Sequence, residues 1–141
     1  MTYNEFVSRP LEMYNRISHQ VEIVQRLENI CMSTTTTLSE KVQTSRQNTQ
    51  EKRYATLADA QRKLNEMTGL LVEICDEVRD FFYENLSFDD ADILEWKYIN
   101  GKSINEISII IDATYSGTAS KISRAEKNAR KAYKQKIEQI C

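Results

Sequence analysis

Residues that break helices are scarce in this chain, which has one proline and three glycines among 141 residues. Because these two residues oppose helix formation most strongly, their scarcity predicts a chain that is helical almost throughout. One segment also carries apolar residues at alternating steps of three and four, the spacing of a coiled-coil seam. Its members are Leu57, Ala60, Leu64, Met67, Leu71, Ile74, Val78 and Phe81. We therefore predict an all-α fold.

A second apolar stripe lies nearer the N-terminus and predicts another helix, from about Asn4 to Met32. Its members are Tyr14, Ile17, Val21, Val24, Leu27 and Cys31. Proline opposes helix inside a segment, so we expect this helix to be well formed only from about Pro10. The polar, threonine-rich stretch 33–52 that follows favours a loop or a frayed end, with continued helix as the alternative.

Two long helices that each carry an apolar stripe can bury those stripes in two ways. The first is an antiparallel hairpin, in which one stripe packs on the other. The second is a homodimer through the later stripe, using Leu57, Leu64, Met67, Leu71, Ile74 and Val78. We favour the hairpin because the linker is long enough to allow it, but periodicity alone does not separate the two.

Capping residues predict a short helix after the second stripe. Ser87, with Asp90 three residues later, is typical of a helix N-cap with an acidic residue in the first turn. A helix over 88–99 should follow. Gly101 then stands where a glycine commonly ends a helix in left-handed conformation.

Two more helices are predicted beyond this glycine. Ser103 and Glu106 form a capping-box pair for a short helix over 104–111. After a turn of about two residues, Thr114 caps a longer helix that runs to about Ile137. A short capped helix, a turn and a longer helix make up the helix-turn-helix plan. We therefore divide the chain into a helical hairpin or coiled coil over 1–86 and a helix-turn-helix domain over 87–141.

Charge is distributed unevenly along the chain, although the net charge is only −2. Residues 76–95 hold eight acidic residues and one basic residue, a composition typical of a solvated helical face. After Ala119 come seven basic residues against two acidic ones: Lys121, Arg124, Lys127, Arg130, Lys131, Lys134 and Lys136. A basic segment in a mildly acidic chain predicts a polyanionic partner for one face only.

Catalytic chemistry has little support in the sequence. The one histidine, His19, has polar neighbours, and no glycine-rich phosphate loop is present. Cys31, Cys75 and Cys141 have neither metal-ligand spacing nor the even number of a disulfide framework. We expect no enzymatic activity, no metal and no cofactor. Neither a signal peptide nor an apolar run long enough for a bilayer is visible, so we expect a cytoplasmic protein without membrane contact.

The stretch from Leu94 to Ala132 carries a recognisable motif. Its matching positions are Leu94, Lys97-Tyr98, Ile99, Gly101, Glu106-Ile107-Ser108, Thr114, Ile122 and Arg124-Ala125. This pattern resembles the DNA-binding region four of bacterial sigma factors. The whole chain resembles the small sigma-like proteins of Gram-positive phages and mobile elements, which are related to phage late-operon transcriptional activators.

Three positions depart from the family pattern. Asp112 replaces the glycine of the turn, and aspartate tolerates left-handed backbone better than most residues. Thr118 stands where an apolar valine is expected, and Gly117 lies inside the recognition helix. Both are expected to weaken the start of that helix and leave Ser116 as an alternative cap to Thr114.

The resemblance implies a DNA-binding transcription regulator of phage or mobile-element genes, acting on promoter DNA, RNA polymerase or both in the bacterial host cytoplasm. With Thr114 as cap, Ile122, Ala125 and Ala129 face inward. The expected DNA contacts are then Lys102, Thr114, Tyr115, Ser116, Ser120, Lys121, Arg124 and Lys127. The alternative is a phage interaction protein that does not bind DNA and uses the helical scaffold to bind a host protein.

Overall fold

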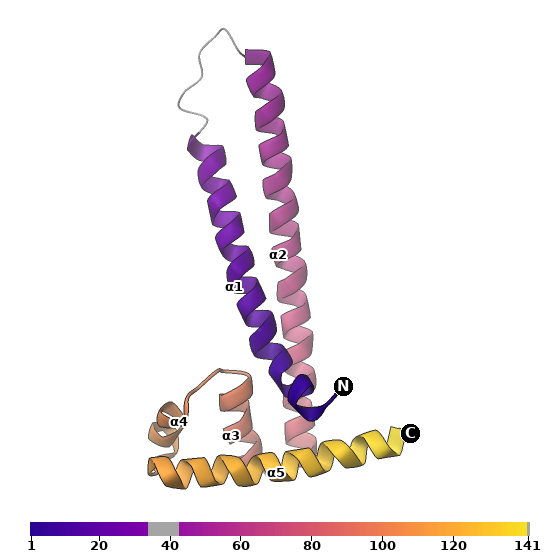
Figure 1. The fold of residues 1–141 in the computed structure, drawn as a ribbon, viewed down its shortest axis with the longest axis vertical. Helices are drawn as coiled ribbons and strands as arrows, with labels where there is room; N and C mark the ends of the chain where they lie inside the picture. Colours follow the sequence, from indigo (N-terminus) through magenta and orange to yellow (C-terminus); the bar gives the residue numbers. More distant parts are fainter. Residues whose placement is uncertain (34–42, 141) are drawn as a thin grey trace. The chain divides into compact units, whose positions relative to one another are not determined.

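The computed structural model describes residues 1–33 and 43–140, and these residues form helices joined by short turns, with no strand among them (Figure 1). The predicted all-α class is therefore confirmed. The helices are α1 (Tyr3–Ser33), α2 (Gln43–Asn85), α3 (Phe88–Tyr98), α4 (Ile104–Ile111) and α5 (Tyr115–Ile140).

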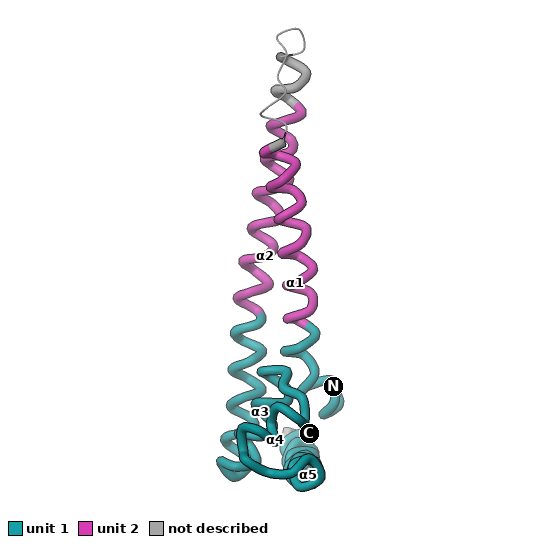
Figure 2. Tube along the Cα trace, turned by 90° about the vertical axis from the view of Figure 1, so that its left-hand side faces the viewer, with its two compact units in different colours: residues 1–12, 71–141 teal, residues 13–70 magenta. Residues whose placement is uncertain are grey.

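The chain forms two compact units, coloured separately in Figure 2. Residues 13–70 form one unit, called here the hairpin unit, and residues 1–12 with 71–141 form the other, called here the helix-turn-helix unit. The boundary expected between residues 86 and 87 matches the end of α2 but lies inside the second unit. Caps mark where helices end, whereas packing decides which helices share a core.

Helix α1 begins at Tyr3, well before Pro10, so the expected start near the proline is wrong. Thr2 and Glu5 make a capping box that the sequence reading overlooked. The Thr2 backbone N–H donates to Glu5 Oε2 at 3.0 Å, and the Glu5 N–H donates to Thr2 Oγ1 at 3.2 Å. These bonds supply partners for the exposed first turn.

Pro10 is buried inside α1 without ending it. Proline has no N–H to donate to the carbonyl four residues earlier, which here belongs to Phe6. The Arg9 side chain donates to that carbonyl instead, with Nε 3.2 Å from the oxygen. Arg9 Nη2 also lies 3.2 Å from Glu77 Oε2 of α2. A neighbouring side chain thus provides the hydrogen bond that proline cannot make.

Within the hairpin unit, α1 and α2 run antiparallel (Figure 1), which confirms the predicted hairpin. Gln20 Nε2 donates to the Ala60 carbonyl at 3.0 Å. Further along, Gln61 Nε2 donates to Glu28 Oε1 at 3.5 Å. The homodimer through the α2 stripe stays a prediction.

The predicted seam of α2 is confirmed as its inward face. Val78 and Phe81 are buried, and the six other members are half-buried: Leu57, Ala60, Leu64, Met67, Leu71 and Ile74. The α1 stripe needs a correction, because Tyr14 is 59% exposed whereas Gln20 is only 5% exposed. Gln20 is polar, yet its amide donates a hydrogen bond to α2 and so can be buried.

The expected loop over 33–52 is wrong for its second half. Residues 43–52 are the first turns of α2, as the continued-helix alternative held. Residues 34–42 lie outside the part of the chain that the structure describes.

The helix-turn-helix unit has an aromatic core. Phe6 of α1 lies 5.4 Å from Phe81 of α2, measured between ring centroids. Tyr133 of α5 lies 5.3 Å from Phe6 and 5.8 Å from Phe81. Phe82 is buried as well and lies 6.3 Å from Tyr98 of α3. A second, smaller cluster is made by Ile93, Ile107 and Ile122 from α3, α4 and α5.

We predict that Gln20 stabilises the hairpin mainly by filling space between α1 and α2 rather than by its hydrogen bond to the Ala60 carbonyl. Replacing it with leucine keeps the volume and leaves no unpaired donor, so the free energy of unfolding should be unchanged or higher. Gln20→Ala removes both the contact and the hydrogen bond and should lower it by about 1–2 kcal/mol. Urea unfolding followed by circular dichroism measures both. Equal losses in the two variants would contradict this role.

Candidate nucleic-acid interface

Helix α3 has the caps expected from its sequence. The Asp90 N–H donates to Ser87 Oγ at 3.4 Å at the helix start. Gly101 follows the helix with φ +67°, in the left-handed region. A Cβ atom there would lie 3.3 Å from the Leu11 side chain, so glycine suits both the backbone and the close approach of α1.

The α4–α5 turn also forms as predicted. Ser103 Oγ accepts the Glu106 N–H at 3.2 Å at the start of α4. Asp112 adopts φ 54° and ψ 53°, the left-handed conformation that aspartate was expected to tolerate in this turn. Thr114 then caps α5, accepting the Gly117 N–H on Oγ1 at 3.1 Å.

The two unusual residues at the start of α5 are accommodated by this cap. Thr118 is fully buried, and its hydroxyl donates to the Thr114 carbonyl at 2.8 Å, so no polar atom is stranded. At Gly117 a Cβ atom would lie 3.0 Å from Thr114 Oγ1, closer than ordinary van der Waals contact. Glycine therefore leaves room for the cap. Ser116 does not serve as the cap and is exposed in the first turn.

Glu126 anchors α5 to α3. Lys97 Nζ lies 2.6 Å from Glu126 Oε1, and the Tyr98 hydroxyl donates to the same oxygen. Burial alone would raise the pKa of Glu126, but the hydrogen bonds from Lys97 and Tyr98 and the nearby positive charges lower it below 4.5. Burial is also the main reason that the pKa of Tyr98 is raised, so the hydroxyl keeps its proton.

A second polar cluster joins α2 to α3. Arg79 Nε lies 2.9 Å from Glu95 Oε1, and the Tyr83 hydroxyl donates to Glu95 Oε2 at 2.6 Å and also to Asp92. Burial and these bonds raise the pKa of Tyr83. Part of the acidic stretch 76–95 therefore connects helices, whereas the sequence predicted a solvated face.

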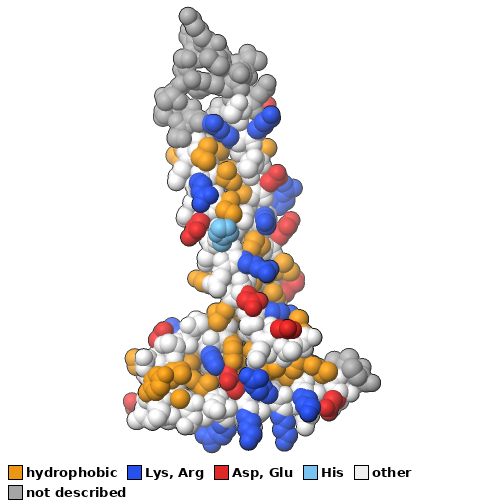
Figure 3. Space-filling view, in the orientation of Figure 1, with side chains coloured by type: hydrophobic (Ala, Val, Ile, Leu, Met, Phe, Trp, Pro, Cys, Tyr) orange, Lys and Arg blue, Asp and Glu red, His pale blue; other side chains and the backbone are white. Residues whose placement is uncertain are grey.

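The inward face of α5 is the one predicted, because Ile122, Ala125 and Ala129 are buried. Its opposite face is exposed and carries polar or basic residues at steps of four, three, four and three: Ser120, Arg124, Lys127, Lys131 and Lys134. Figure 3, in the orientation of Figure 1, shows basic side chains projecting along α5. We call these five residues the outer row.

Three of the predicted DNA contacts come together on this face. Ser120, Arg124 and Lys127, with Ala119 and Ser123, line one shallow hollow of the surface. Near the start of the helix, Tyr115 and Ser116 are also exposed. The basic residues Lys131 and Lys134 continue the same row, and steps of three and four from Lys127 could have identified them.

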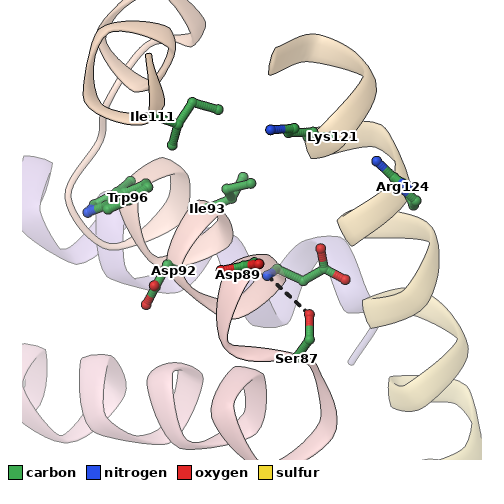
Figure 4. A pocket seen from close by; sticks show the side chains of 9 residues that line it. Ser87, Asp89, Asp92, Ile93, Trp96, Ile111, Lys121 and Arg124 are labelled. Carbon is green, nitrogen blue, oxygen red and sulfur yellow. Dashed lines mark hydrogen bonds between the residues drawn. The ribbon is translucent and has the colours of Figure 1, made fainter. Parts of the chain in front are cut away.

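Lys121 lies on a flank of α5 rather than in the outer row. With Arg124 it lines a cavity of about 500 Å³ (Figure 4). Across the cavity are carboxylates and apolar side chains from α3 and the end of α4: Asp89, Asp90, Asp92, Ile93, Trp96 and Ile111. Lys121 thus faces negative charge of its own chain, which the sequence did not reveal.

The remaining two predicted DNA contacts, Lys102 and Thr114, already interact with other residues of this chain. Lys102 Nζ lies 3.6 Å from Glu106 Oε2, so part of its charge is balanced. The Thr114 hydroxyl oxygen accepts the capping bond from Gly117. Both residues are exposed, but neither belongs to the outer row.

The described residues contain neither a metal-binding group nor a membrane-spanning helix. No group of three or more histidine, cysteine or acidic side chains there is arranged to hold a metal ion. None of the helices in that part of the chain is long and apolar enough to cross a membrane.

We predict that Glu126 makes stability depend on pH in the acid range. Because its pKa is lowered in the folded chain, the unfolded chain takes up a proton first as the pH falls. The stabilisation is complete above about pH 4.5 and is lost as the pH falls through the folded pKa. Glu126→Gln should cost roughly 1–3 kcal/mol at pH 7 and weaken this dependence.

The measurement is the free energy of unfolding from pH 7 to pH 3. Glu138→Gln, at an exposed position on the same helix, is the matched control and should keep the wild-type profile. Identical profiles for wild type and Glu126→Gln would contradict the anchoring role.

Comparison with known protein families, curated proteins and solved structures finds no match for this chain. The chemistry of α5 and the helix-turn-helix motif therefore carry the functional proposal.

Proposed function

We propose that this chain is a DNA-binding transcription regulator that uses α5 as its recognition helix. The observation that carries the proposal is the outer row, in which four cations follow one another on the exposed face of α5, opposite its buried face. Charge gathered along one helix face is the electrostatic footprint of a nucleic-acid-binding surface.

The N-terminal half of α5 suits contact with base edges. Its exposed residues Ser116, Ser120 and Ser123 are small and carry hydroxyl groups. Small side chains let a helix enter the major groove deeply, and serine can donate to or accept from a base. Serine makes no bidentate contact of the kind that arginine makes with guanine, so sequence discrimination by one copy should be modest.

The C-terminal half of the outer row suits phosphates. Arg124, Lys127, Lys131 and Lys134 extend over about 15 Å at the helical rise per residue. Such a row can follow the DNA backbone and position the helix without reading sequence. Binding through these cations releases counterions and should weaken steeply with salt.

The sigma-like motif suggests where such a protein would act. By that resemblance we place its target in promoter DNA of phage or mobile-element genes, in the cytoplasm of a bacterial host. RNA polymerase is a further partner by the same resemblance and would compensate for modest base discrimination.

We predict that Arg124→Ala/Lys127→Ala weakens binding to the duplex upstream of the neighbouring genes by at least about tenfold in 100 mM salt. Two lost phosphate contacts should also make the plot of log K against log salt shallower by about 1.8. Fluorescence anisotropy with a labelled duplex of 30 base pairs gives both values. Lys52→Ala/Lys63→Ala, which removes the same charge from exposed residues of the hairpin unit, should leave both unchanged.

Two results would contradict DNA binding through α5. Absence of binding to any duplex at 20 mM salt, or equal loss in the two double variants, would contradict recognition through α5.

One observation favours the alternative, a protein-binding role for the same unit. Ile109 and Ile110 of α4 are 80% and 47% exposed, and Tyr115 at the start of α5, just after the turn, is 56% exposed. Exposed apolar side chains of this kind are typical of protein contacts. If no duplex binds, Ile109→Ser/Ile110→Ser should abolish capture of the host protein that the wild-type chain retains.

A further inference from the structure

We propose that the hairpin unit binds an amphipathic helix of a partner protein, one with acidic residues beside its apolar stripe. The site is a groove between α1 and α2, separate from the face of α5 discussed above. It does not depend on DNA binding, because every residue of the groove belongs to residues 13–70.

The groove has a volume of about 580 Å³ and a mainly apolar surface. Its lining residues are Met13, Asn15, Arg16, His19 and Gln20 from α1, and Lys63, Met67 and Leu70 from α2. Figure 3 shows apolar side chains along the hairpin, with both basic and acidic side chains beside them.

The apolar part of the groove lacks full cover in the single chain. Leu70 is 48% exposed, and Met13 and Met67 are only half-buried. Two helices can cover each other on one side only, so the seam stays partly open along its edges. A third helix laid in this groove would bury these side chains, as in peptide recognition by helix-in-groove packing. Methionine side chains adapt readily to such a partner.

The charged residues that line the groove indicate which class of partner fits it. Arg16 on one edge and Lys63 on the other carry positive charge, and no acidic residue is among those that line the groove. A helix with acidic residues on both sides of its apolar stripe would meet complementary charge at both edges. A second copy docked by two-fold symmetry would instead bring the same basic side chains together. The observations therefore favour an acidic helix over self-association.

The test uses the full chain and two fluorescein-labelled peptides of twenty residues. Both carry leucine at positions i, i+3, i+4 and i+7, flanked by glutamate in the acidic peptide and by lysine in the basic one. Fluorescence anisotropy should show that the acidic peptide binds at least about tenfold more tightly, a difference of about 1.4 kcal/mol. Arg16→Glu/Lys63→Glu should reverse this preference.

Two further variants keep the outcome interpretable. Leu70→Gln changes a half-exposed residue and should weaken the acidic peptide without altering the helical content measured by circular dichroism. It serves as the test if charge reversal disturbs folding. Lys127→Glu/Lys131→Glu on α5 should leave peptide binding unchanged while impairing DNA binding, so the two proposals fail separately.

Three results would overturn the inference. The first is equal affinity for both peptides, and the second is no binding of either peptide. The third is a concentration-dependent dimer in sedimentation that Arg16→Glu/Lys63→Glu abolishes, which would assign the groove to a second copy.

Discussion

The helix-turn-helix unit depends on two adjacent phenylalanines at the end of α2. Phe81 and Phe82 are both buried, although neighbours on a helix point about 100° apart. Phe81 contacts Phe6 and Tyr133, while Phe82 contacts Tyr98. Burying both requires cover from two directions, and the start of α1 together with α3 and α5 provides it. Burying each phenylalanine contributes about 1.5–3 kcal/mol of hydrophobic stabilisation, which favours packing these four helices together.

This packing determines which face of α5 meets solvent. Ala125 and Ala129 belong to the same core as the phenylalanines, and their small size lets α5 approach closely. Glu126, beside them, is held by Lys97 and Tyr98. Rotation of α5 about its axis would break both sets of contacts. The cations of the outer row therefore face solvent as a consequence of the core, and the proposed DNA-binding role rests on this arrangement.

Features that depend on neighbouring residues were predictable from the sequence. The caps at Ser87, Ser103 and Thr114 are local hydrogen bonds, and the left-handed residues Gly101 and Asp112 follow from backbone preferences. The α2 seam was predictable as well, because periodicity records which side of a helix is buried.

Features that depend on residues far apart in the sequence were not predictable from it. Gln20 is buried because the Ala60 carbonyl of α2 is within reach. Pro10 is a local exception, because the neighbouring Arg9 side chain bonds to the Phe6 carbonyl. Lys121 was expected at DNA, yet it lines a cavity with Asp89, which only the folding of α3 beside α5 reveals. In each case the partner comes from another side chain or helix whose position periodicity does not encode.

The central claim is that α5 approaches DNA with its outer row, and chemical-shift mapping tests it most directly. The backbone amides of the 15N-labelled chain are followed while a duplex of 20 base pairs is added. We predict that the largest shifts fall between Ser116 and Lys134 of α5, with little change across residues 13–33 and 49–70. Shifts confined to those two ranges, or no shifts at saturating duplex, would contradict the claim.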